Sequence, residues 1–93
     1  MERILPLRKK IDEIDGKILL LLKERAEVCK IIGAIKTEHA IPIRNRSREL
    51  KIYDQIIRKS SQLKLDPIKV KAIYREIVSM CVHVQESKTL KTS

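Results

Sequence analysis

The chain has 93 residues, a formal net charge of +9, and neither phenylalanine nor tryptophan. A domain of this size buries only a modest core unless it associates with a partner subunit, and here that core must consist of isoleucine, leucine and valine. Basic and acidic residues alternate along the whole chain without a polybasic block, which argues against nucleic acid and favours a small anionic ligand. No apolar run is long enough for a membrane helix and nothing at the N-terminus resembles a signal peptide, so we expect a cytoplasmic protein without a membrane partner.

The first predicted element is a helix over about residues 6–40, because residues 7–40 contain no proline and their apolar residues recur at alternating intervals of four and three. These are Leu7, Ile11, Ile14, Ile18, Leu21, Val28, Ile32 and Ile35. The helix would form a rod of roughly 50 Å, whereas a compact domain of this size has a radius of gyration of about 12 Å. Gly16 and Gly33 each weaken a helix by only about 1 kcal/mol. We therefore expect a continuous helix whose exposed half packs against a second copy of the chain.

A second helix is predicted over about residues 46–61. Pro42 disfavours helical geometry at the residue before it, so the first helix should end near Ala40. Asn45 is a good N-cap for the second helix, although Ser47 competes for that role.

A third helix is predicted over about residues 67–86, because Asp66 followed by Pro67 is typical of an N-cap and the first helical position. No strand pattern or internal repeat competes with these elements. We expect an all-α fold, with one long N-terminal helix and two shorter helices in a single domain over residues 1–93.

Two cysteines, Cys29 and Cys81, lie far apart in the sequence, each on an apolar face of a predicted helix. We expect two buried free thiols, and the alternative is a disulfide between them.

The apolar pattern of the long helix requires an apolar residue between Leu21 and Val28, but that position holds Arg25. A guanidinium stays charged and is costly to bury without an anion, so a negative group is expected opposite it. The simplest candidate is an aspartate or glutamate of the same chain. The other candidate is an anionic ligand, because Lys36 lies three turns later and projects from nearly the same face.

Three further residues fit a site for a small polyanion. Arg48 and Glu49 fall in the first turn of the second helix, where free backbone amides favour an anion. Gln85 is an uncharged donor beside the apolar stripe of the third helix, although alone it would be taken for a surface residue. Helically spaced metal ligands, a phosphate-binding loop and a serine, histidine and aspartate set are all missing. We expect a site without metal or cofactor that acts through electrostatics and conformational restraint.

At these positions the sequence resembles the all-helical, AroQ-type chorismate mutases. The matching segments follow one another from the first helix to the third, and their order and spacing are more specific than any one of them. They are Leu7-Arg8-Lys9-Lys10-Ile11-Asp12 with Ile14-Asp15, Leu22-Lys23-Glu24-Arg25, Lys36, Pro42-Ile43-Arg44-Asn45 with Arg48-Glu49, and Gln85.

The resemblance implies an intertwined homodimer of three-helix subunits with two equivalent active sites. It implies that chorismate is converted to prephenate in phenylalanine and tyrosine biosynthesis. This reaction is a unimolecular Claisen rearrangement that requires no nucleophile, metal or cofactor, so the enzyme would be an isomerase with chorismate as its small-molecule partner.

The resemblance also implies roles for individual residues. Arg25 and Arg8 would bind the substrate carboxylates. Lys36 and Gln85 would donate hydrogen bonds to the ether oxygen as charge develops on it. Glu49 would accept a hydrogen bond from the ring hydroxyl.

The edge of the site departs from the family pattern at two positions. Arg48 would order the corner around Glu49, and the backbone at Asn45 would assist. Asn45 stands where many relatives have aspartate, and Cys81 stands where some have serine near a substrate carboxylate. We expect altered affinity rather than loss of activity from these two changes.

Arg8 and Arg25 cannot share one small ligand within a subunit, because 17 residues of straight helix separate them by about 25 Å. The antiparallel pairing that the resemblance implies would bring Arg8 of the partner subunit into the site.

Two other functions are alternatives. An isochorismate pyruvate-lyase of the same fold shares most of the cations, although Arg48 and Glu49 together favour the mutase. A basic helical dimer that binds nucleic acid or another protein would explain the net charge, but it would leave Arg25 unexplained. Binding of nucleic acid would depend steeply on salt.

Overall fold

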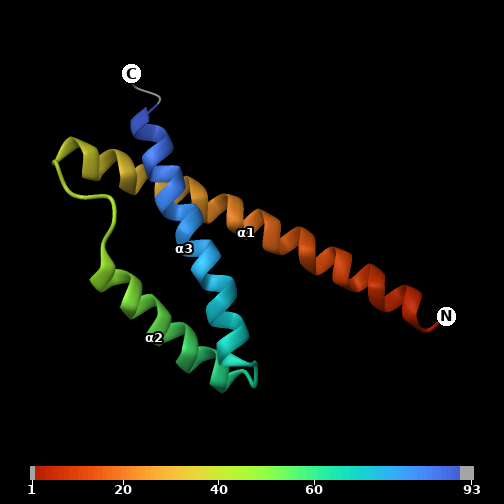
Figure 1. Ribbon diagram of the computed structural model, residues 1–93. Helices are drawn as coiled ribbons and strands as arrows, with labels where there is room; N and C mark the ends of the chain where they lie inside the picture. The colour runs from red at the N-terminus through yellow and green to blue at the C-terminus, as the bar shows by residue number, and fades with distance from the viewer. Residues whose placement is uncertain (1, 91–93) are drawn as a thin grey trace.

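The computed structural model describes residues 2–90 and contains three helices, α1 (Ile4–Glu38), α2 (Arg46–Gln62) and α3 (Pro67–Leu90) (Figure 1). The all-α class is confirmed, and α1 is continuous through both of its glycines as predicted. It begins and ends two residues earlier than predicted, and α3 extends four residues beyond residue 86. Residues 1 and 91–93, at the two ends of the predicted domain, lie outside the described residues.

The helices α1 and α2 end in the same way, with one residue in the left-handed conformation. After α1, Ala40 has a φ of 55°, and the amide of Ile41 donates to the carbonyl of Lys36 at 2.7 Å. Lys64 takes the same role after α2, with a φ of 60°. This is the Schellman arrangement, in which glycine is usual because a side chain disfavours positive φ. It ends α1 before Pro42 is reached, which explains why the helix stops earlier than predicted.

Side-chain caps start α2 and α3 where the sequence predicts them. Asn45 Oδ1 accepts a hydrogen bond from the amide of Arg48 at 3.1 Å, so Asn45 rather than Ser47 caps α2. Asp66 Oδ1 accepts from the amide of Ile68 at 3.0 Å at the start of α3. Each cap satisfies an amide that has no partner inside its helix.

The third helix holds the molecule together, because α3 packs against both α1 and α2. It crosses the C-terminal half of α1 (Figure 1). Cys29 of α1 and Val78 of α3 are buried. The N-terminal half of α1 projects away from the other helices (Figure 1). The chain therefore measures 56 × 28 × 14 Å, and its radius of gyration of 16.8 Å exceeds the value of about 12 Å for a compact domain.

The apolar pattern of α1 is exposed along this projecting half. The five side chains there expose between 45% and 64% of their surface, and they are Leu7, Ile11, Ile14, Ile18 and Leu21. Such a stripe agrees with the prediction that a second copy covers it, and the dimer itself stays a prediction. None of the helices within residues 2–90 has the length and apolar character needed to cross a membrane.

Candidate active site

A cavity of about 390 Å³ is lined by residues of all three helices and of the loop before α2. Seven of the eight predicted site residues line it, namely Arg25, Lys36, Asn45, Arg48, Glu49, Cys81 and Gln85. The rest of its wall is mainly isoleucine and valine. The polar groups therefore lie in an apolar wall, where charges are less screened than in open water.

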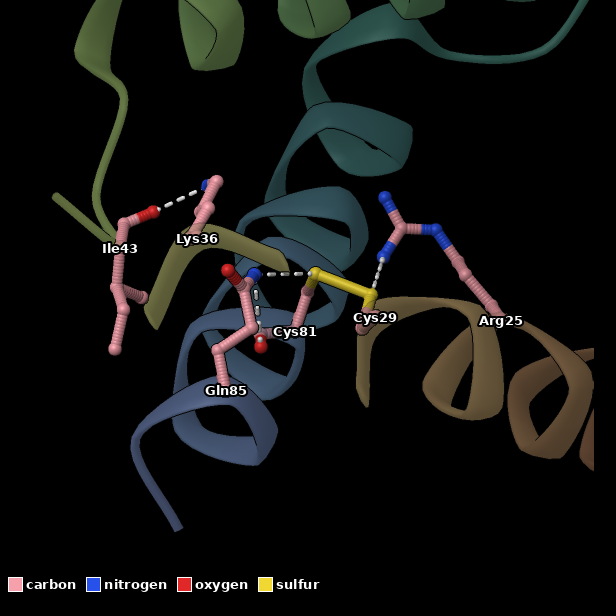
Figure 2. Close-up of a disulfide and its surroundings, with 6 residues drawn as sticks. All are labelled: Arg25, Cys29, Lys36, Ile43, Cys81 and Gln85. Carbon is pink, nitrogen blue, oxygen red and sulfur yellow. Dashed lines mark hydrogen bonds between the residues drawn. A yellow bond between two sulfur atoms is a disulfide. The ribbon is translucent and has the colours of Figure 1, made fainter. Parts of the chain in front are cut away.

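Lys36 is held at the cavity by the loop between α1 and α2. Its Nζ donates to the carbonyl of Ile43 at 2.6 Å (Figure 2). An ammonium group has three donors, so this bond leaves donors for a ligand. The same contact ties the loop to the last turns of α1.

Arg25 is partly buried on α1. Its Nη1 lies 3.9 Å from Cys29 Sγ, one turn later (Figure 2). Neither ion pair among the described side chains includes Arg25. An aspartate or glutamate of the same chain is therefore not its partner there, and the adjacent cavity is the place where an anion would reach it.

Glu49 supplies the buried carboxylate of the cavity and exposes 8% of its surface. Its Oε1 accepts a hydrogen bond from Arg44 Nη2 at 3.0 Å. Its Oε2 is buried and has no hydrogen bond to any described group. A buried oxygen without a partner is costly, so Oε2 is suited to accept a hydrogen bond from a ligand hydroxyl.

The ion pair of Glu49 involves a residue to which the sequence assigned no role. The resemblance predicts that Arg48 orders this corner. Arg48 lines the cavity, but the residue paired with Glu49 is Arg44. Asn45 Oδ1 is engaged in capping the amide of Arg48, a function that asparagine and aspartate perform equally well. The departure from aspartate therefore leaves the start of α2 intact.

The prediction of two free thiols is wrong, because Cys29 and Cys81 form a disulfide that joins α1 to α3 (Figure 2). The crossing of the two helices brings their Cα atoms to 5.5 Å, which is within the usual range for a disulfide. Separation in the sequence gave no sign of this proximity. Cys81 in this form has no S–H group, so it does not replace a serine hydroxyl as a donor.

Gln85 is buried at the same crossing and exposes 4% of its surface. Its Nε2 donates to Cys81 O at 3.3 Å and lies 3.2 Å from Cys81 Sγ, one turn earlier (Figure 2). Sulfur is a weak acceptor. A ligand oxygen in the cavity would be a better acceptor for the same amide.

Arg8 is the one predicted residue that does not line the cavity. It is exposed on the projecting half of α1, about 25 Å from Arg25 along the helix. Any part that it plays in this site requires a second chain.

The cavity combines positive charge with one buried acceptor. Arg25, Lys36 and Arg48 place three cations around it. The amide of Gln85 and Oε2 of Glu49 add an uncharged donor and a carboxylate acceptor. This arrangement fits a small anion that carries a hydroxyl group, and it can stabilise negative charge that develops on one of the ligand oxygens.

Comparison with known proteins identifies the family of this chain. A family profile described as chorismate mutase type II matches residues 7–86. The chain is 40% identical over 89 residues to a bifunctional chorismate mutase/prephenate dehydratase from Aquifex aeolicus, and the alignment covers 92% of this chain and 25% of that protein. It is 48% identical over 56 residues to a chorismate mutase from Methanocaldococcus jannaschii, with 60% of this chain and 57% of that protein covered.

A solved structure has the same fold. The chain resembles a conserved hypothetical protein from Pyrococcus furiosus with a TM-score of 0.71 and 33% identity, over 91% of this chain and 97% of that chain. The present chain thus matches nearly all of this solved structure. It spans only a quarter of the Aquifex relative and somewhat more than half of the Methanocaldococcus relative.

Proposed function

Because this chain belongs to the chorismate mutase type II family, we propose that it is an isomerase that converts chorismate to prephenate. The observation that carries the proposal is the cavity in which Arg25, Lys36, Glu49 and Gln85 come together from three helices. Chorismate is a small dianion with a ring hydroxyl and an ether oxygen. Its groups match the cations, the acceptor and the uncharged donor of this cavity.

The proposed reaction is a Claisen rearrangement, in which an ether C–O bond breaks as a C–C bond forms. Negative charge develops on the ether oxygen in the transition state. Lys36 and Gln85 would donate hydrogen bonds to this oxygen, and interactions that strengthen in the transition state raise kcat. Arg25 would bind a carboxylate and hold the substrate in its reactive conformation.

Glu49 would bind the ring hydroxyl through Oε2, the oxygen that lacks a partner among the described groups. Arg44 supports this role because it pairs with Oε1 and leaves Oε2 for the ligand. Arg48 and the backbone of Asn45 would complete this side of the substrate site. Cys81 would contact the substrate only through its disulfide sulfur.

A homodimer would complete the site. The exposed apolar stripe on the projecting half of α1 supports pairing with a second chain. Antiparallel pairing would bring Arg8 of the partner subunit to the cavity, where it would bind the second carboxylate. The proposal therefore places each of two sites between two chains.

The proposal includes no cofactor, no nucleic-acid partner and no membrane partner, and it places the protein in the cytoplasm. Disulfides are rare in cytoplasmic proteins other than those of hyperthermophiles. The redox state of Cys29 and Cys81 in cells would therefore test the location.

The test of the proposed function is to add chorismate to the purified protein, follow the loss of its diene absorbance and identify the product by chromatography. Formation of prephenate is expected. Failure of a folded helical dimer to consume chorismate would contradict the proposal. Turnover of isochorismate to release pyruvate would then identify the lyase, and salt-dependent binding of nucleic acid would identify a basic binding module.

A mixed dimer tests whether the site is shared. Arg8→Ala and Arg25→Ala homodimers should both be nearly inactive, whereas the dimer that contains one chain of each should have one intact site of its two. Lys9→Ala on the next residue of α1 is the control for Arg8→Ala. If mixing restores no activity, the two arginines do not act in one site.

A further inference from the structure

Gly33 of α1 lies against Gln85 of α3 at the point where the two helices cross. Gly33 is buried. A Cβ atom added to it would lie 2.9 Å from Gln85 Cγ and 3.0 Å from both Cα and Cβ of Gln85. Protein carbon atoms at optimal contact lie about 3.5–4.0 Å apart. Because Cα belongs to the backbone of α3, a change of rotamer at Gln85 would not relieve the clash, and the helices themselves would have to separate.

The same crossing carries the disulfide one turn earlier on each helix. Cys29 precedes Gly33 by four residues, Cys81 precedes Gln85 by four residues, and the two cysteines are joined. The cross-link therefore allows little sliding of α3 along α1. Because the disulfide restrains this sliding, the absence of a side chain at Gly33 determines how far Gln85 extends into the cavity.

The two groups proposed to donate to the ether oxygen come from opposite sides of this crossing. Lys36 lies on α1, three residues after Gly33, and Gln85 lies on α3. Both line the same cavity. The distance between the two helices at Gly33 therefore sets the distance between the two donors.

Gly16 provides the contrast within the same helix. A Cβ atom added at Gly16 would meet no atom within 4 Å. Glycine weakens a helix relative to alanine at either position, but only at Gly33 does the missing side chain permit a close approach.

We propose that Gly33 is a positioning residue for Gln85, because the missing side chain lets α3 approach α1 closely enough for the amide of Gln85 to reach the reacting ether oxygen. The inference rests on the proposed mutase function. It predicts that Gly33→Ala lowers kcat by about tenfold or more, since a donor misplaced by about 1 Å loses much of its effect on the transition state. KM should change less, because Arg25 and Lys36 stay in place on α1.

The experiment compares Gly33→Ala with Gly16→Ala in the chorismate assay. Gly16→Ala should keep the kcat of the unaltered protein. A second comparison places Gly33→Ala in a Gln85→Ala background, where it should cause little further loss because the group that it displaces is gone. An unchanged kcat in Gly33→Ala, or an equal loss in both backgrounds, would overturn the inference.

A second measurement does not depend on turnover. The side-chain NH₂ signals of Gln85 can be assigned in a ¹⁵N–¹H spectrum by their loss in Gln85→Ala. They should shift in Gly33→Ala and stay in place in Gly16→Ala, and unshifted signals would overturn the inference. If the unaltered protein does not consume chorismate, the proposed function fails, and this spectrum still decides the placement of Gln85.

A folding failure would also be informative. If Gly33→Ala does not fold, replacement of Gln85 by glycine removes Cβ and Cγ, two of the three atoms that clash with the new methyl group, and leaves only Cα at 3.0 Å. A more helical circular dichroism spectrum in the double variant than in Gly33→Ala would assign the clash to Gln85. A double variant that is no more helical than Gly33→Ala would overturn the inference.

Discussion

The two halves of α1 share one apolar pattern but have different surroundings. Residues 4–24 project from the molecule, and Leu7 exposes 64% of its surface there. Residues 25–38 cross α3, and Cys29 exposes 4% of its surface there, although the residues of the apolar pattern in this half still expose between 40% and 51%. The same periodicity therefore predicts a helix in both halves, but it does not show what covers the apolar side chains of each half. In the proposed dimer, the packed half contacts α3 of its own chain, and the projecting half contacts a second chain.

Replacement of Arg25 by alanine should have the largest effect on activity. It should disturb the site at the packed half and leave the projecting half unchanged. Loss of one partner of a buried charge pair costs about 2–5 kcal/mol, so kcat/KM should fall by roughly 30-fold to several thousandfold. The dimer should persist, because Arg25 lies outside the projecting half. Turnover and size-exclusion chromatography check both outcomes, with Lys30→Ala as the control on an exposed position of the same half. Unchanged turnover would remove Arg25 from the site.

Gln85→Glu tests the residue of α3 that faces the packed half. At neutral pH the variant should lose about a hundredfold in kcat, the typical effect of removing one transition-state donor. A carboxyl group donates a hydrogen bond only when protonated, and an ordinary glutamate has a pKa of about 4.3. Activity relative to Gln85→Ala should therefore rise as the pH falls towards that value. A ratio of the two variants that does not change with pH would count against the proposed role of Gln85.

Ile14→Gln tests the projecting half in the same way. If the exposed stripe is the dimer interface, each of two chains loses the burial of the 45% of the Ile14 surface that a single chain exposes, which is about half of the 1.5–3 kcal/mol for complete burial of an isoleucine. The dissociation constant of the dimer should rise by roughly one to two orders of magnitude, as measured by analytical ultracentrifugation. Lys9→Gln, which points away from the stripe, should leave it unchanged. An unaltered dimer in Ile14→Gln would mean that the two chains pair through another surface.

The helices could be predicted from local chemistry. Asn45 and Asp66 satisfy the first amides of α2 and α3, and this capping is visible in the sequence. The end of α1 was less predictable, because its left-handed residue is Ala40 rather than glycine. An alanine in the sequence gives no sign of positive φ, so the predicted end near Ala40 depends on Pro42 alone and lies two residues beyond the observed end.

The site was partly predictable for a related reason. The sequence predicts Arg25 as a site residue because it interrupts an apolar pattern, and it predicts Lys36 because this residue follows on the same face. The disulfide, the pairing of Glu49 with Arg44 and the contact at Gly33 depend on how the helices cross and how the loop returns. Periodicity within one helix does not fix the crossing of two helices, so these three features required the structure.

Reduction of the disulfide should destabilise the packed half more than the projecting half, because this cross-link belongs to the packed half alone. Dithiothreitol transfers two electrons and two protons to the disulfide, which leaves two thiols on the protein and a cyclic disulfide on the reagent. The cysteines are separated by 52 positions. Loss of such a cross-link typically costs about 2–4 kcal/mol, so the thermal midpoint should fall by about 10 °C or more. A Cys29→Ser/Cys81→Ser variant should not respond to the reagent.

Amide hydrogen exchange would show where the lost stability resides. Exchange should accelerate in α3 and in residues 25–38, because the disulfide joins these two segments. It should change much less in residues 4–24, which the proposed dimer protects through a different surface. Equal acceleration in both halves would mean that α1 unfolds as one cooperative unit. The two halves of the helix would then differ in burial and in the chain that they contact, but they would not unfold separately.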